Sequence, residues 1–77
     1  MTQPQQPQQP SIRVVANGTP CSAPAGSKIP DLVRQLGLHP DRVIVERNGQ
    51  ALTRAEAAAT QLADGDRLEI VRIVAGG

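Results

Sequence analysis

Apolar and polar side chains alternate through the first segment that could form regular structure. In SIRVVANG, Ile12 and Val14 would lie on one side of an extended backbone and their neighbours on the other, which is typical of a half-buried strand. Asn17 and Gly18 follow, and both residue types accept the positive φ of a tight hairpin turn. The sequence TPCSAP is then predicted to return as a second strand, whose prolines favour an edge of the sheet.

The next segment has helical spacing. Four aliphatic side chains in GSKIPDLVRQLGL recur at i, i+3, i+4 and i+7 and would form one apolar stripe, namely Ile29, Leu32, Val33 and Leu36. We expect Ser27 to cap the N-terminus of this helix and Gly37 to end it. Pro30 fits the first turn, because the first N–H groups of a helix have no partner within the helix.

A third strand and a short helix are predicted after this main helix. The segment DRVIVERNG has period two, with Val43 and Val45 on one face and Ile44 and Glu46 on the other. Its Asn-Gly pair predicts another tight turn. The sequence TRAE, at positions 53–56, then has the spacing of a capping box, which opens a short helical turn.

The last patterned segment, RLEIVRIV, again has the period of a strand. Leu68 and Ile70 would share one face, and Val71 and Ile73 the other. The sequence ADGD before it predicts a tight turn. The order is therefore two strands, a helix, a strand, a short helix and a strand. Because a sheet and a helix each bury one face against the other, this order predicts an α+β domain. It is typical of the ubiquitin-like β-grasp, a mixed sheet of four or five strands covered by one main helix.

The composition limits what such a domain can do. A chain of 77 residues forms one domain at most, and the absence of Phe, Trp and Tyr leaves Ile, Val, Leu and Ala to build the core. A net charge of +1, spread along the chain, is not the basic footprint of a nucleic-acid-binding protein. The segment MTQPQQPQQP lacks the apolar residues that packing needs. We therefore interpret residues 1–10 as a disordered Gln/Pro-rich leader and residues 11–77 as the folded domain.

Few side chains suggest chemistry. Cys21 has no His or Lys beside it in sequence that would lower the pKa of its thiol, so we interpret it as a small residue packed inward. His39 is the only histidine and lacks partners for a metal site, which favours a solvated loop position. Asp64 and Asp66 flank Gly65, and a lone Asp-Gly-Asp is more typical of a turn than of a cation site. The sequence predicts neither an enzyme active site nor a metal site.

The two glycines at the end of the sequence, Gly76 and Gly77, are not explained by stability. Glycine loses more backbone freedom on ordering than any other residue. An α-carboxylate is ionised at neutral pH and is a poor electrophile until it is activated. An enzyme that activates it must enclose the tail in a narrow site, which glycine permits because it has no Cβ. The sequence therefore predicts that the terminal carboxylate is the functional group.

These features together resemble a known family. From Ser11 to Gly77 the chain is similar to the ThiS-type sulfur carrier proteins of thiamine thiazole biosynthesis, a ubiquitin-like β-grasp family. The resemblance rests on AGSKIPDLVRQLGL, VIVERNG, LADGD and RLEIVRIVAGG, which occur in this order. It covers the whole chain except the leader.

The resemblance implies a carrier that is a co-substrate of other enzymes. In the family, an ATP-dependent adenylating enzyme of the ubiquitin-activating type converts the C-terminal carboxylate to an acyl-adenylate. Sulfur from a persulfide donor displaces AMP and leaves a thiocarboxylate, which donates sulfur to thiazole synthase. For this chain the resemblance implies that Gly77 bears the thiocarboxylate and that Gly76 shapes a flexible tail. No bound cofactor is expected, and ATP is used by the activating partner.

A surface for these partners is predicted on the outer face of the sheet, near the tail. Branched apolar residues on a solvent face are unusual unless a partner covers them. The predicted surface consists of Ile44, Glu46, Val71, Arg72 and Ile73. We expect the free chain to be a monomer in the cytoplasm, with no nucleic-acid or membrane partner.

Three other functions remain open at this point. The small subunit of molybdopterin synthase shares the fold, the Gly-Gly end and the thiocarboxylate, but that family runs longer and carries prolines just before its glycines. A ubiquitin-like protein modifier would instead join Gly77 to lysines through isopeptide bonds. A plain β-grasp interaction domain would use its surface and leave the tail idle. The sequence RIVAGG contains no proline, which favours the thiamine pathway.

Overall fold

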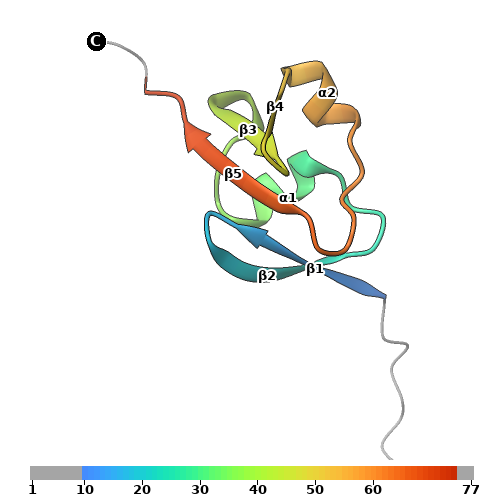
Figure 1. The fold of residues 1–77 in the computed structure, drawn as a ribbon. Coiled ribbons are helices and arrows are strands. Elements are labelled where there is room, and N and C mark those ends of the chain that lie inside the picture. The colour runs from blue at the N-terminus through green and yellow to red at the C-terminus, as the bar shows by residue number, and fades with distance from the viewer. Residues whose placement is uncertain (1–9, 75–77) are drawn as a thin grey trace, which may run out of the picture.

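A computed structural model of the chain describes residues 10–74 (Figure 1). The elements are β1 Ser11–Ala16, β2 Thr19–Pro24, α1 Ile29–Gln35, the 3₁₀ helix η1 Pro40–Arg42, β3 Val43–Arg47, β4 Gln50–Leu52, α2 Arg54–Ala59 and β5 Arg67–Arg72. The five strands form one sheet in the order β2-β1-β5-β3-β4. Only the β1–β5 pair is parallel among these strand pairs, so the sheet is mixed.

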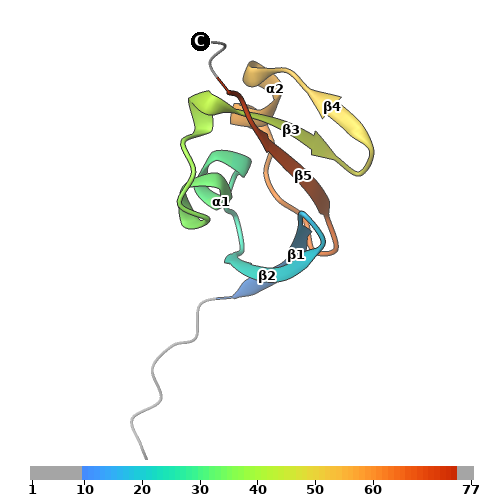
Figure 2. The ribbon, with the colours of Figure 1, turned by 90° about the vertical axis from the view of Figure 1, so that its left-hand side faces the viewer.

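The arrangement confirms the predicted α+β, ubiquitin-like fold. Helix α1 lies across one face of the sheet, and β5 runs between β1 and β3 (Figures 1 and 2). The short strand β4 supplies the fifth strand, which the sequence pattern left open. The core lies between α1 and the sheet and consists of Val14, Ala23, Ile29, Leu32, Val33, Val45, Leu62, Leu68 and Ile70.

The turn between β1 and β2 does more than the hairpin signal predicts. Asn17 and Gly18 both have positive φ, at 51° and 79°, as expected for Asn-Gly in a two-residue hairpin turn. In addition, the Asn17 side chain binds the backbone of Ile70: its Oδ1 accepts from the N–H at 2.7 Å and its Nδ2 donates to the carbonyl at 3.1 Å. This side chain therefore continues the pairing between β1 and β5 beyond the end of β1.

The N-terminus of α1 differs from the prediction. Lys28, not Ser27, is the N-cap, and its N–H donates to the Asp31 carboxylate at 2.8 Å. A cap at Ser27 would place Pro30 at the third helical position, where it has no N–H to donate to the hydroxyl. The Ser27 hydroxyl instead donates to the Pro24 carbonyl at 2.6 Å. The prediction for Ser27 was wrong by one residue because proline removes the donor that the cap would need.

The C-terminus of α1 follows the glycine signal but changes the buried stripe. Gly37 has a φ of +80° and its N–H donates to the Arg34 carbonyl, while Leu38 N–H donates to the Val33 carbonyl. This pair of bonds is the Schellman arrangement. Leu36, the C-cap, still donates its N–H to the Leu32 carbonyl but its side chain is exposed, whereas Leu38 packs against the core.

Candidate functional site

The end of β5 determines where the chain leaves the domain. The strand ends at Arg72, and the Ile73 N–H still donates to the Arg42 carbonyl at 2.8 Å. The side chain of Val74, the last described residue, is 84% exposed. The predicted site residues Gly76 and Gly77 lie outside the described residues, as does all but the last residue of the predicted leader 1–10. The described chain thus leaves the sheet directly from its central strand.

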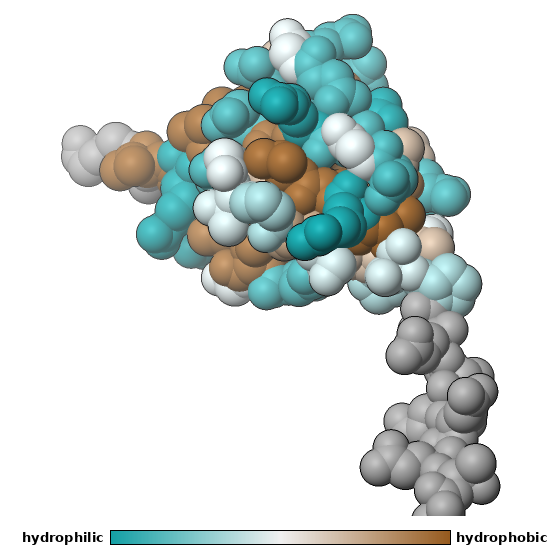
Figure 3. Space-filling model, turned by 60° about the horizontal axis from the view of Figure 1, so that its bottom comes forward, coloured by the Kyte–Doolittle hydropathy of each residue, from teal (hydrophilic) through white to brown (hydrophobic). Residues whose placement is uncertain are grey.

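The outer face of the sheet, opposite α1, carries most of the predicted partner surface. Ile44, Val71 and Ile73 are 54%, 58% and 47% exposed. Ile44 and Val71 are directly opposite each other in the β3–β5 register. Figure 3 shows exposed apolar atoms among polar ones, including the last atoms before the grey C-terminal segment. We refer to Ile44, Val71 and Ile73 as the outer apolar patch.

Two acidic residues extend this patch, and one predicted basic residue does not belong to it. Glu46 is exposed beside Ile44 and is directly opposite Glu69, which the sequence reasoning missed. Alternation along β5 places Glu69 on the same face as Val71. The same alternation places Arg72 on the face of Leu68 and Ile70, so the structure does not bring Arg72 to the outer face. Cross-strand register, not the sequence pattern, shows which residues are neighbours.

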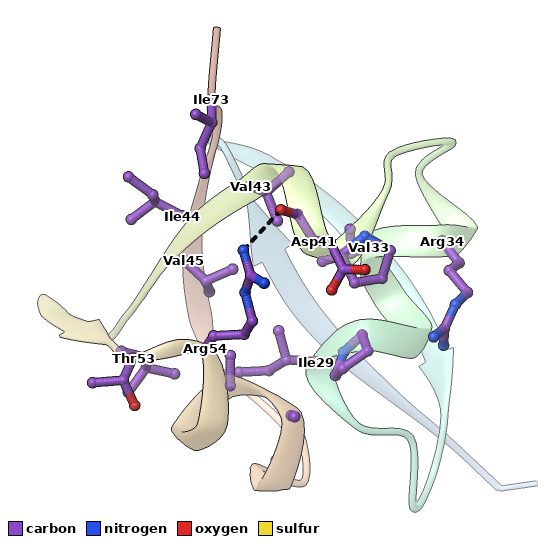
Figure 4. Close-up of a pocket in the computed structure, with 15 residues that line it drawn as sticks. Ile29, Val33, Arg34, Asp41, Val43, Ile44, Val45, Thr53, Arg54 and Ile73 are labelled. Carbon is purple, nitrogen blue, oxygen red and sulfur yellow. Dashed lines mark hydrogen bonds between the residues drawn. The ribbon is translucent and has the colours of Figure 1, made fainter. Parts of the chain in front are cut away.

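A groove of about 320 Å³ adjoins the patch at the start of β3. It lies between α1, η1, β3 and α2, and its lining includes Ile44 and Ile73 as well as core residues (Figure 4). The Arg54 guanidinium donates to the Asp41 carbonyl at 3.1 Å across one part of it. The lining is mostly aliphatic, and its charged side chains are those of Arg34, Asp41 and Arg54.

No group of three or more His, Cys, Asp or Glu side chains that could hold a metal ion is found within residues 10–74. Cys21 is half-buried and packs against the core, as predicted. His39 is exposed, and its Nδ1 accepts from the Asp41 N–H at 3.2 Å, so it caps η1.

The Asp-Gly-Asp turn has a structural role that its sequence does not show. Asp64 accepts from the Arg13 N–H at 2.8 Å. Asp66 is only 5% exposed and accepts from Arg47 Nε at 3.0 Å, Asn48 Nδ2 at 3.0 Å and Ala63 N–H at 2.8 Å. It therefore joins the start of β5 to the turn between β3 and β4. The sequence does not indicate this role, because Asn48 and Asp66 are 18 residues apart and only the folded sheet brings them together.

The electrostatics of Asp66 follow from these contacts. Burial by itself would raise the pKa of the Asp66 carboxyl. The hydrogen bonds from Ala63, Asn48 and Arg47, together with the positive charge of Arg47, outweigh burial and hold that pKa below its ordinary value. The pKa of Glu56 is also lowered, because its carboxylate accepts from the Thr53 N–H at 2.8 Å in the predicted capping box. Both carboxylates are thus structural anchors in their charged form.

Known proteins are similar to this chain over nearly its full length. A crystal structure of a thiamine biosynthesis protein (ThiS) from Geobacter metallireducens is 30% identical, with a TM-score of 0.66, and the match covers 86% of this chain and 100% of that one. A designed protein based on human erythrocytic ubiquitin, 19% identical with a TM-score of 0.54 over 87% of this chain and 95% of its own, shares the fold.

Sequence comparison adds a relative of a different size. A thiazole synthase from Magnetococcus marinus is 35% identical over 66 residues, which are 86% of this chain and 20% of the relative. The chain therefore spans about a fifth of the length of the curated relatives it matches. The model of the ThiS family matches residues 9–77. Because this match covers almost the whole chain and the structure has the ubiquitin-like sheet, the protein belongs to the ThiS family.

Proposed function

We propose that this protein is a sulfur carrier of thiamine thiazole biosynthesis whose C-terminal carboxylate is its functional group. The observation that carries the proposal is the family match, which extends to Gly77 and so includes the Gly-Gly end. The described structure supports a carrier in a second way. It places exposed apolar residues, on which a partner could dock, beside the exit of the chain.

The proposed reactions take place at the carboxylate of Gly77 while the chain is bound to partner enzymes. An adenylating enzyme joins the carboxylate oxygen to the α-phosphate of ATP and releases pyrophosphate. The terminal sulfur of a persulfide then attacks the acyl carbon and displaces AMP. A thiol attacks the donor-side sulfur of the resulting acyl disulfide, which releases the thiocarboxylate and leaves a disulfide between the thiol and the donor. Activation is required because a carboxylate is ionised at neutral pH and resists nucleophilic attack.

The proposed role of the folded domain is to position the C-terminal tail. Strand β5 is paired on both sides, by β1 and β3, and Asp66 anchors its start. The hydrogen bond from Ile73 to Arg42 holds the chain to the sheet just before Val74. A partner that binds the outer apolar patch therefore also fixes the position at which the tail leaves the sheet. Pre-organisation of this kind lowers the entropic cost of bringing the carboxylate into an active site.

The second proposed partner is thiazole synthase. Two relatives named thiazole synthase contain a segment that is 35% and 33% identical to this chain over 66 residues. In those proteins a ThiS-like segment and the rest of the synthase belong to the same polypeptide. We infer that this chain delivers its sulfur to a thiazole synthase.

Growth rescue tests the pathway directly. The chain is expressed in cells that lack their own thiazole-pathway sulfur carrier, and in cells that lack the small subunit of molybdopterin synthase. We expect growth without added thiazole in the first strain and no molybdenum-enzyme activity in the second. The opposite result would assign the protein to molybdenum-cofactor synthesis, and rescue of neither strain by a well-expressed chain would contradict both carrier functions.

The outer apolar patch provides a second prediction. Replacing Val71 with Asp should weaken binding to the adenylating enzyme by about thirtyfold or more, because a charge would be buried where an apolar side chain packs. Ile73→Asp should act in the same direction. Leu36→Asp is the matched control, since Leu36 is also an exposed aliphatic residue but lies at the end of α1. Calorimetric titration measures the affinity, and thermal unfolding verifies that each variant is folded. Equal losses for all three folded variants would contradict the proposed surface.

A further inference from the structure

The acidic side chains divide into two groups by their contacts. The sequence has seven Asp and Glu residues, all within the described range. Five of them accept a hydrogen bond or lie within 4 Å of a basic side chain, and these are Asp31, Asp41, Glu56, Asp64 and Asp66. Glu46 and Glu69 have neither kind of contact to residues 10–74. The structure thus uses five carboxylates internally and leaves two unused.

These two carboxylates are direct neighbours. Glu46 on β3 and Glu69 on β5 are paired in the antiparallel register. Their side chains therefore leave the same face of the sheet, with Cβ atoms about 5 Å apart. Like charges at directly opposite positions destabilise a sheet. The central strands of the sheet therefore carry a repulsive pair that no hydrogen bond or ion pair from residues 10–74 offsets.

The residues around the Glu46–Glu69 pair indicate which kind of group could offset its repulsion. On one side it adjoins the Ile44–Val71 pair, which is the next pair in the outward-facing register. On the other side the nearest outward basic residue is Arg67, two positions along β5, and no ion pair joins it to either glutamate. The face therefore combines exposed apolar area with two negative charges that form no ion pair within the described part of the chain. A complementary surface must supply a positive charge beside apolar side chains.

We propose that the Glu46–Glu69 pair receives an arginine or lysine side chain of the adenylating enzyme when apolar residues of that enzyme cover Ile44 and Val71. This inference rests on the proposed function and names the chemistry of the partner at that surface. One cation between two carboxylates is charge-complementary, and the apolar contacts beside it exclude water and strengthen the ion pairs. Arginine suits such a position because its planar guanidinium can donate to both carboxylates.

The test uses the full chain and the adenylating enzyme of the same organism. Affinity is measured for Glu46→Gln, for Glu69→Gln and for the double variant at several salt concentrations. We expect each single variant to weaken binding by roughly tenfold and the double variant to lose most of its salt dependence. Because one cation contacts both carboxylates, the losses should not be additive. The same substitutions remove repulsion within the sheet, so the Tm should stay unchanged or rise.

A matched control separates local contact from overall charge. Ala59→Lys changes the net charge by the same amount but lies at the exposed C-terminal end of α2, where a positive charge suits the helix dipole. It should bind like the parent chain. Glutamine variants that bind with parental affinity and salt dependence would overturn the inference, and so would an equal loss in Ala59→Lys. A normal thiocarboxylate yield in those glutamine variants would leave the proposed function intact even if this inference failed. The proposed function itself is tested separately, by deletion of Gly77.

Discussion

Deleting Gly77 is expected to reduce thiocarboxylate formation by at least about a hundredfold. The truncated chain still ends in a carboxylate, but that group is set back by one residue, which is about 3.5 Å along an extended chain. A misplacement of even 1 Å at a reacting centre can cost roughly a hundredfold in rate. Adding one residue after Gly77 should have the same effect, because the former carboxylate becomes an ordinary peptide carbonyl.

The measurement is intact-protein mass spectrometry after incubation with the adenylating enzyme, ATP and a persulfide donor. The full-length product should gain the mass difference between sulfur and oxygen, located on the C-terminal peptide. Gly76→Ala is the graded control: it keeps the carboxylate in place but adds a Cβ in a narrow channel, so an intermediate yield is expected. Equal sulfur loading of the truncated and full-length chains would exclude the carrier mechanism, and loading on Cys21 would move the chemistry to a thiol that packs against the core.

Replacing Asp66 with Ala is expected to have the largest effect on folding. The change leaves the Arg47 guanidinium, the Asn48 amide and the Ala63 N–H without their shared acceptor. Arg47 is partly exposed in this ion pair, but each buried donor that loses its acceptor costs about 1–3 kcal/mol, and a small domain has few kcal/mol to lose. We expect the Tm to fall by more than about 10 °C. Asp64→Ala is the matched control in the same turn, because its exposed carboxylate accepts only the Arg13 N–H among these bonds and should cost about 1 kcal/mol.

The same residue predicts how stability depends on pH. The folded-state pKa of Asp66 is lowered, so its contribution is fully present above the ordinary Asp value of about 3.9 and is lost as pH falls through the folded-state pKa. Glu56 contributes in the same direction. The free energy of unfolding should therefore decrease more steeply in acid for the parent chain than for Asp66→Ala. Parallel curves for the two proteins would contradict the role assigned to Asp66.

Local sequence patterns predicted most of the elements and their buried faces, but not β4, η1 or the exposure of Leu36. Period two in β1, β3 and β5 predicted that Leu68 and Ile70 face the core and that Val71 and Ile73 face outward, as the structure shows. The Asn-Gly turns and the Thr53 capping box formed where predicted. These signals are reliable because each depends on residues within a few positions of one another. The α1 cap lies one residue after the predicted Ser27, because Pro30 has no N–H to donate to a cap at that position.

The tertiary structure decided everything that depends on which segments meet. Parallel pairing with β1 makes β5 a central strand, and the antiparallel pairing of β5 with β3 brings Asp66 to Arg47 and Asn48. The register between β3 and β5 places Glu46 opposite Glu69. A period of two assigns a side chain to a face, but it cannot name the residue across from it, because any even shift of register preserves the same pattern. The faces of the strands were therefore readable from the amino-acid order, whereas the ion pair and the acidic pair required the packed sheet.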